Sequence, residues 1–253
     1  MSTLVSRDND VLLLKPPFVQ AWDARRRPLP VRPLRLPGRP RPRWPDLPPP
    51  PWLGTGPLDQ PFDFCQHMAL LCQDIVERCA ALSHIDVSRL LFAVTQARTN
   101  RPYGLQARVT PMRFRDGGLR RVRRGVCYQV QRFFVNAREM LYLITFCLPR
   151  FLDQDFDDKF ITLFHELYHI SPEFNGDLRR HEGRYSVHSH SQKAYDAYMA
   201  QLARAYLSNG CDKALHNFLR LDFAQLQRRH GSVMGAIVPR PKLIPVWRGK
   251  ARK

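Results

Sequence analysis

Prolines are distributed so unevenly that they divide this chain into two parts. Fifteen of the 22 prolines lie within residues 1–61, and the stretch "RRRPLPVRPLRLPGRPRPRWPDLPPPPW" at 25–52 is the extreme. Proline fixes its own backbone, removes a hydrogen-bond donor and pushes the preceding residue toward extended conformations. The sequence therefore predicts a disordered or extended Pro/Arg-rich arm over 1–61, and an ordered domain that begins near Phe62.

Basic residues dominate the two ends of the chain. The formal net charge is +18, and residues 227–253 contain eight Lys or Arg and no acid. A charge this high favours an anionic partner such as nucleic acid, although a solvated surface accounts for it equally well. We expect residues 226–253 to form a flexible or surface-hugging basic tail, and residues 62–225 to form the folded domain.

Three segments outside the proline-rich arm are predicted to be helices, and the first has clear amphipathic periodicity. In "DFCQHMALLCQDIVERCAAL" at 63–82, apolar residues recur with a period near 3.6, and Asp63 is a candidate cap. A second helix is predicted at about 191–208, where Asn209-Gly210 provides a signal for its end. A shorter helix is predicted at about 211–220.

Three segments between these helices favour strands. They cover 89–97, 104–114 and 126–148, and the third is predicted to be two strands around a turn near 136–139. The intervening "RFRDGGLRRVRRG" at 113–125 predicts a hairpin tip with a cluster of arginines. This tip is either a contact for nucleic acid or a solvated loop.

The cysteines and the apolar runs indicate the cellular compartment in which the protein is expected. None of the six cysteines forms a Cys-x-x-Cys pair, so a zinc ribbon is not indicated. The longest apolar run, at 140–148, is less than half of a membrane span, and the N-terminus lacks a signal-peptide pattern. These features predict a soluble cytoplasmic protein with no membrane contact.

The segment "KFITLFHELYHISPEF" at 159–174 contains the pattern His-Glu-x-x-His. On a helix, His165 and His169 lie on one face and can direct their rings at one ion, with Glu166 beside them. The pattern predicts a zinc site in which Glu166 is the general base toward an activated water. The helix is expected to begin after "LPRFLDQDFDD", with Asp157 or Asp158 as its cap.

Neighbouring residues support a metal site over a chance match. Apolar residues at 160, 161, 163, 164 and 167 predict a packed helix whose histidines face away from the core. Zinc needs a third protein ligand, and His181, His188 and His190 follow within reach. His188 is the favoured ligand because it directly precedes the next predicted helix. His190, His181 and an acidic residue are the alternatives.

Three stretches, "ITLFHELYHI", "GDLRRHEGR" and "HSHSQKAYDAYMAQLA", carry a resemblance to a known family. Together they resemble the phage metallopeptidase domain family, over about 62–225. The resemblance implies an α+β, zincin-like fold (minigluzincin/SprT-like), with a small, mainly antiparallel sheet, the HExxH helix at the active site and flanking helices. The chain is more distantly similar to SprT-like and Spartan proteases. That likeness implies His188 as third ligand and Tyr195 as a following aromatic, but Ser189 replaces a glycine and the gap is longer, which keeps His190 open.

Two functions from different classes follow. The first is a zinc-dependent metallopeptidase that cleaves a protein or peptide substrate, with Zn²⁺ bound by His165, His169 and His188 and with Glu166 as general base. The alternative is a basic nucleic-acid-associated protein that uses its arms and the 113–125 tip, with a structural or vestigial metal site. The SprT-like analogy suggests that both can coexist, in a protease that acts on DNA-bound proteins.

Overall fold

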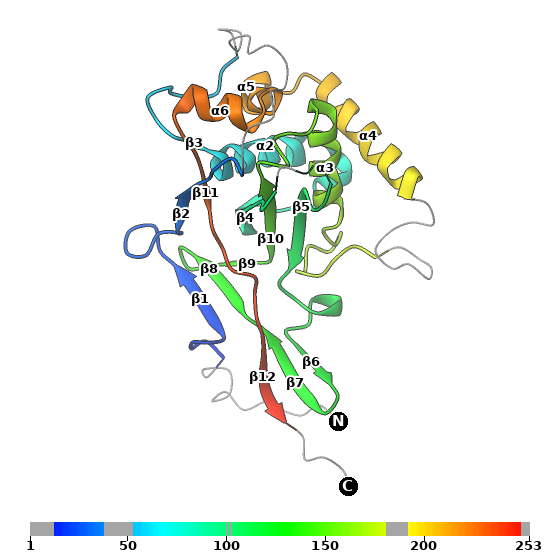
Figure 1. Ribbon diagram of the computed structural model, residues 1–253. Helices are drawn as coiled ribbons and strands as arrows, with labels where there is room; N and C mark the ends of the chain where they lie inside the picture. Colours follow the sequence, from blue (N-terminus) through cyan, green and yellow to red (C-terminus); the bar gives the residue numbers. More distant parts are fainter. Residues whose placement is uncertain (1–12, 38–52, 100, 102, 181–191, 249–253) are drawn as a thin grey trace.

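The computed structural model describes residues 13–37, 53–99, 101, 103–180 and 192–248, which form a mixed α+β structure with several helices and small sheets (Figure 1). The helices are α2 (Phe64–Arg78), α3 (Phe156–Tyr168), α4 (Gln192–Ser208), α5 (Lys213–His216) and α6 (Phe223–His230). The strands are β1 (Val19–Trp22), β2 (Val31–Pro33), β3 (Phe62–Asp63), β4 (Leu90–Gln96), β5 (Ala107–Pro111), β6 (Arg120–Arg123), β7 (Val126–Val130), β8 (Arg132–Val135), β9 (Arg138–Met140), β10 (Tyr142–Leu148), β11 (Val233–Ala236) and β12 (Leu243–Arg248).

The central sheet has the order β4-β10-β5, and β10 is parallel to β4 but antiparallel to β5. The prediction of a mainly antiparallel sheet is wrong here, and three of the four described sheets mix both directions. Strands β4 and β10 are nearly continuous apolar runs, which need cover on both faces and therefore take adjacent, buried positions. Strand β5 alternates apolar with polar residues and lies at the edge.

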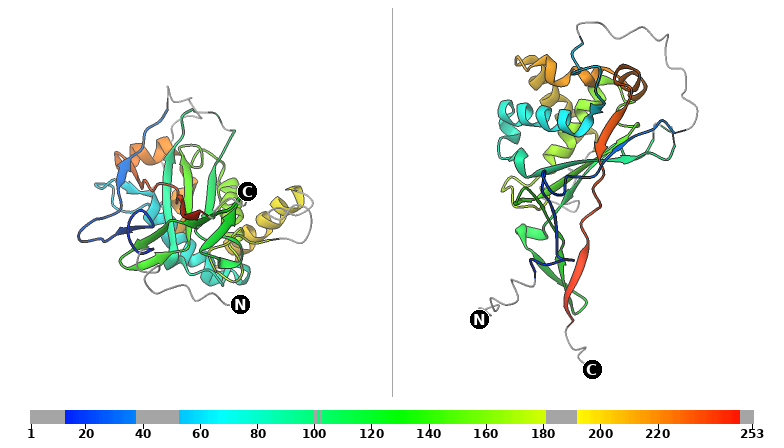
Figure 2. Two further views of the ribbon diagram at one scale, coloured as in Figure 1. Left: turned by 90° about the horizontal axis from the view of Figure 1, so that it is seen from below. Right: turned by 90° about the vertical axis from the view of Figure 1, so that its left-hand side faces the viewer.

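The two faces of the central sheet pack against different layers. Apolar side chains of α2, α3, α4 and α6 cover one face, and the helices lie together at one end of the molecule in the right-hand view of Figure 2. On the other face, Leu91 and Leu143 pack with Trp22, Phe133 and Met140 of the sheet β1-β8-β9. The large helical core therefore lies on the face that carries α3.

Part of the proline-rich arm is integral to the fold. Strand β1 pairs in parallel with β8, and β2 pairs with β11. Trp22 and Leu34 are each only 4% exposed, so this part of the arm is extended rather than disordered, and two buried side chains hold it against the domain although most of its residues are exposed. Proline is compatible with an edge strand such as β2, because one side of that strand needs no partner. Residues 1–12 and 38–52 of the arm lie outside the described part.

The predicted basic tail is also structured, over 226–248. Strand β11 lies between β2 and β3, and Val233 is fully buried. Gly235 lies so close to β4 that a Cβ there would come within 2.4 Å of a Val94 methyl carbon. Of the two predicted alternatives, a flexible or a surface-hugging tail, the flexible one is wrong here, because the basic residues flank short apolar stretches that form strands β11 and β12.

Several local predictions are confirmed. Asp63 caps α2 by accepting from the Gln66 N–H at 3.0 Å, and the helix 191–208 is α4, followed by Gly210 at a φ of +68°. The turn near 136–139 is present, with Asn136 and Ala137 at positive φ, although the block 126–148 holds four strands, β7 to β10. No helix within the described ranges is long and apolar enough to cross a membrane.

The predicted hairpin tip at 113–125 is shorter in the structure. A 3-10 turn at Arg115–Gly117 and strand β6 occupy most of that stretch, and β6 pairs with β7 through the turn Arg124-Gly125. Both turn residues have positive φ. The Asp116-Gly117 pair forms an earlier bend, with Gly117 packed against Asn175.

Candidate metal centre

Helix α3 carries the first two residues of the motif. Its inner face is fully buried through four residues at helical spacing: Phe160, Leu163, Phe164 and Leu167. The N-cap is Asp155, so the prediction of Asp157 or Asp158 is wrong. Both of these acids lie instead in the first turn, where their negative charges interact favourably with the positive end of the helix dipole. The helix ends at Tyr168, and His169 is its C-cap.

The structure brings His165 and His169 together. Their ring centroids are 4.6 Å apart, with the ring planes at 77°, and the backbone N–H of His169 donates to the His165 carbonyl at 3.2 Å. His169 is buried and His165 is partly exposed. Two imidazoles on successive turns are thus near enough to serve one ion.

Glu166 points toward the edge strand of the central sheet. It is 9% exposed, and its Oε2 accepts a hydrogen bond from the Val109 N–H of β5 at 2.6 Å. Burial raises the pKa of Glu166 to about 7, although the Val109 hydrogen bond and the Arg108 charge act in the opposite direction. A carboxyl with this pKa can both accept and release a proton near neutral pH.

Helix α4 adds two neighbours to the histidine pair. The Tyr195 ring lies 4.8 Å from the His165 ring and 5.9 Å from the His169 ring, stacked on the latter at 24°. The Asp196 Oδ1 lies 3.8 Å from the His165 Nδ1. The resemblance pointed to Tyr195, but sequence reasoning did not single out Asp196. Its one available signal was an acid early in the helix that follows the motif.

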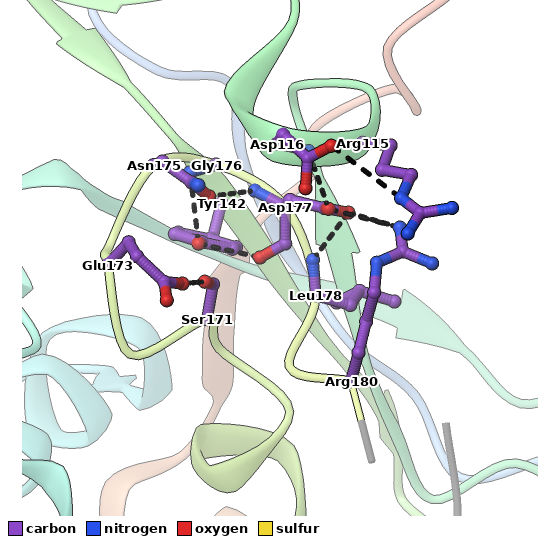
Figure 3. Close-up of polar contacts among 10 residues, drawn as sticks. All are labelled: Arg115, Asp116, Tyr142, Ser171, Glu173, Asn175, Gly176, Asp177, Leu178 and Arg180. Carbon is purple, nitrogen blue, oxygen red and sulfur yellow. Dashed lines mark hydrogen bonds and ion pairs between the residues drawn. The ribbon is translucent and has the colours of Figure 1, made fainter. Parts of the chain in front are cut away.

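The segment from Ser171 to Arg180 folds back against the motif and is fixed by polar contacts (Figure 3). The Tyr142 hydroxyl donates to the Asp177 carbonyl at 2.7 Å and accepts from the Gly176 N–H at 3.0 Å. The Asp177 carboxylate accepts from the Asp116 N–H and from the Arg180 guanidinium, each at 3.0 Å. The chain that leaves His169 is therefore tied to both β10 and the bend before β6.

One end of this segment returns directly to the motif. The Arg179 N–H donates to the His169 carbonyl at 2.7 Å, and the Arg179 guanidinium lies over the Tyr168 ring at 4.0 Å. The backbone at the end of α3 is thus held in place from outside the helix.

The described residues include the types of ligand that zinc prefers, but among them there are too few ligands to complete a zinc site. Two imidazoles with an adjacent carboxylate are the donors and the base that zinc hydrolases use. Among the described residues no group of three possible ligands converges. The predicted third ligand His188 and its alternatives His190 and His181 all lie outside the described residues. Their selection stays a prediction.

Comparison with known proteins found no matching family model, no similar curated protein and no similar solved structure. The geometry around α3 is therefore the basis on which a function can be argued.

Proposed function

We propose that this chain is a zinc-dependent metallopeptidase with a zincin-like fold that acts on a protein or peptide substrate. The observation that carries the proposal is the cluster at the end of α3. There, the rings of His165 and His169 lie 4.6 Å apart, and the adjacent Glu166 is buried against β5. A chance occurrence of the pattern on a solvated helix face would leave Glu166 in water.

Each residue has a distinct role in this proposal. His165 and His169 hold the metal, together with a third ligand from 181–191, for which His188 is preferred. When bound, zinc supplies Lewis acidity and lowers the pKa of water toward neutrality. Glu166 accepts the proton of the attacking water and later gives it to the leaving amine. The Val109 N–H fixes the direction of the carboxylate throughout.

The position of β5 supports a peptide as substrate. In the described sheet this strand is an edge, so one side of its backbone is not paired with another strand. An extended peptide can add to such an edge through main-chain hydrogen bonds. A peptide bound there would lie next to Glu166, because that carboxylate contacts the same edge at Val109.

Metal analysis of purified protein tests the proposal. We expect the wild type to retain zinc after dialysis, and His165→Ala and His169→Ala to lose it. In the same series, His181→Ala, His188→Ala and His190→Ala identify the third ligand, and His188→Ala is expected to lose zinc. A wild type that binds no zinc when the metal is supplied would refute the proposal. Loss of zinc in His181→Ala but not in His188→Ala would overturn our choice of ligand.

Asp196 is expected to orient His165 rather than to bind the metal. A carboxylate beside the distal nitrogen of a ligating histidine fixes the tautomer and ring position, and its loss typically costs about 10- to 100-fold in metal affinity. We therefore expect Asp196→Asn to weaken zinc binding by that factor, as measured by competition with a chelator. The exposed acid Asp157 provides a charge-matched control, and Asp157→Asn should bind zinc normally. Complete loss of zinc in Asp196→Asn would instead make Asp196 a ligand.

Association with nucleic acid is the second candidate function. The observation that favours it is the group of exposed arginines on β6 and its turn, which belongs to a different sheet from β5. The two functions concern separate surfaces and are compatible in one protein.

A further inference from the structure

The sheet formed by β6, β7 and β12, here called the arginine-rich sheet, has an unusual charge distribution. It lies at the far end of the molecule from the helices (Figure 1). Strand β6 and its turn supply Arg120, Arg121, Arg123 and Arg124, and no Asp or Glu occurs within 117–138 or 223–253. None of its three strands therefore carries a carboxylate.

The strand register places two arginines and a tyrosine on one face. Arg121 lies opposite Tyr128, and Arg123 lies opposite Val126. Residues directly opposite each other share a face, and residues two apart along a strand do as well. Arg121, Arg123 and Tyr128 therefore project to the same side, while Val122 projects to the other.

These arginines are exposed and have no acidic partner in the described structure. Arg121, Arg123 and Arg124 are all solvent-exposed. Within the described ranges, no carboxylate lies in ion-pair distance of any of the three. By contrast, Arg113 and Arg132 near the base of this region both pair with Glu139 at 2.6 Å. The positive charge of the outer three is thus available to a ligand.

A cavity of about 460 Å³ opens on this face. Its lining combines the three arginines with apolar and aromatic side chains: Phe114, Arg121, Arg123, Arg124, Tyr128 and Leu243. The volume suits a group the size of a nucleotide. A solvated charged surface does not need a hollow with aromatic walls, so the lining itself indicates a ligand with both negative charge and a flat apolar part.

We propose that this cavity binds single-stranded nucleic acid. Guanidinium groups recognise phosphate through charge-assisted, bidentate hydrogen bonds, and bases stack on aromatic rings such as those of Tyr128 and Phe114. A duplex keeps its base faces stacked inside, so it can use the arginines but not the rings. The aromatic lining therefore favours a single strand. This inference rests on the second candidate function, association with nucleic acid, and is independent of the zinc site on α3.

Fluorescence anisotropy with a labelled oligothymidylate and the full-length protein tests the proposal. We expect binding that weakens steeply with salt, because each phosphate contact releases condensed counterions. Arg121→Gln/Arg123→Gln should weaken binding at least tenfold and reduce the salt slope by about one to two. Tyr128→Leu should weaken binding by about 5- to 150-fold and leave the salt slope unchanged.

The matched control is Arg138→Gln/Arg204→Gln, which removes the same charge from exposed positions on β9 and α4, outside both the arginine-rich sheet and the basic arms. It should bind nearly as the wild type does, and circular dichroism should show all variants folded. Glu166→Gln should also bind normally, which separates this site from the peptidase proposal. Equal weakening by both arginine pairs, no effect of Tyr128→Leu, or tighter binding to a duplex or to anionic vesicles than to the single strand would each overturn the proposal.

Discussion

Glu166→Gln is expected to lower the rate of peptide hydrolysis by about 10²- to 10⁴-fold while zinc content stays at the wild-type level. The amide matches the carboxylate in shape, and its oxygen can still accept the Val109 N–H that now lies 2.6 Å from Oε2. What is lost is the ability to take up a proton. Hydrolysis of fluorescently labelled casein, followed beside metal content, measures both quantities.

Glu173→Gln is the control for this substitution. Glu173 lies seven residues further on, is exposed, and contacts Ser171 rather than the histidine pair. Its variant should cleave casein at the wild-type rate. A rate of casein cleavage by Glu166→Gln equal to that of the wild type would refute the assigned mechanism. Loss of both cleavage and zinc in Glu166→Gln would show that Glu166 is needed for metal binding, and the variant would then give no support to a role in proton transfer.

Lys159→Met is expected to destabilise the protein by about 3 kcal/mol, the largest stability change that we predict. Lys159 is only 2% exposed, and its Nζ donates to the carbonyl oxygens of Leu219 and Leu221 at 2.8 and 2.9 Å. Removal of the donor leaves two buried acceptors without this partner, and each costs about 1–3 kcal/mol. Methionine keeps most of the volume, so the change reports mainly on the hydrogen bonds.

Urea unfolding of Lys159→Met beside Lys213→Met measures the effect. Lys213 is exposed on α5, and its replacement should change the free energy of unfolding by no more than about 0.5 kcal/mol. Comparable m-values would show that the unfolded states are alike. Equal destabilisation by the two variants would mean that the contacts between α3 and residues 219–221 contribute little.

Local elements were predictable because their causes are local. The period near 3.6 in 63–82 and the cap at Asp63 identified α2, and Asn209-Gly210 marked the end of α4. The spacing of His165 and His169 required only a helix to bring the rings to one face. Each of these inferences depends on residues a few positions apart, whose geometry the backbone fixes.

Strand order was not predictable, because it depends on partners that are distant in the chain. Strand β10 lies between β4 and β5, and β1 finds its partner in β8. The proline content of the arm correctly argues against helix, but it does not decide between solvation and edge pairing. Only burial of side chains such as Trp22 decides that.

The candidate site likewise has features that the sequence predicts and features that only the tertiary structure shows. By itself, the sequence determined the helix, the histidine pair and the presence of a carboxylate beside it, because these follow from positions four and one apart on a single element. The tertiary structure alone decided that Glu166 is buried against Val109, that Asp196 faces His165, and that Lys159 is an interior anchor. Those contacts join elements separated by tens of residues, and packing of whole layers, rather than any local pattern, sets the distances between them.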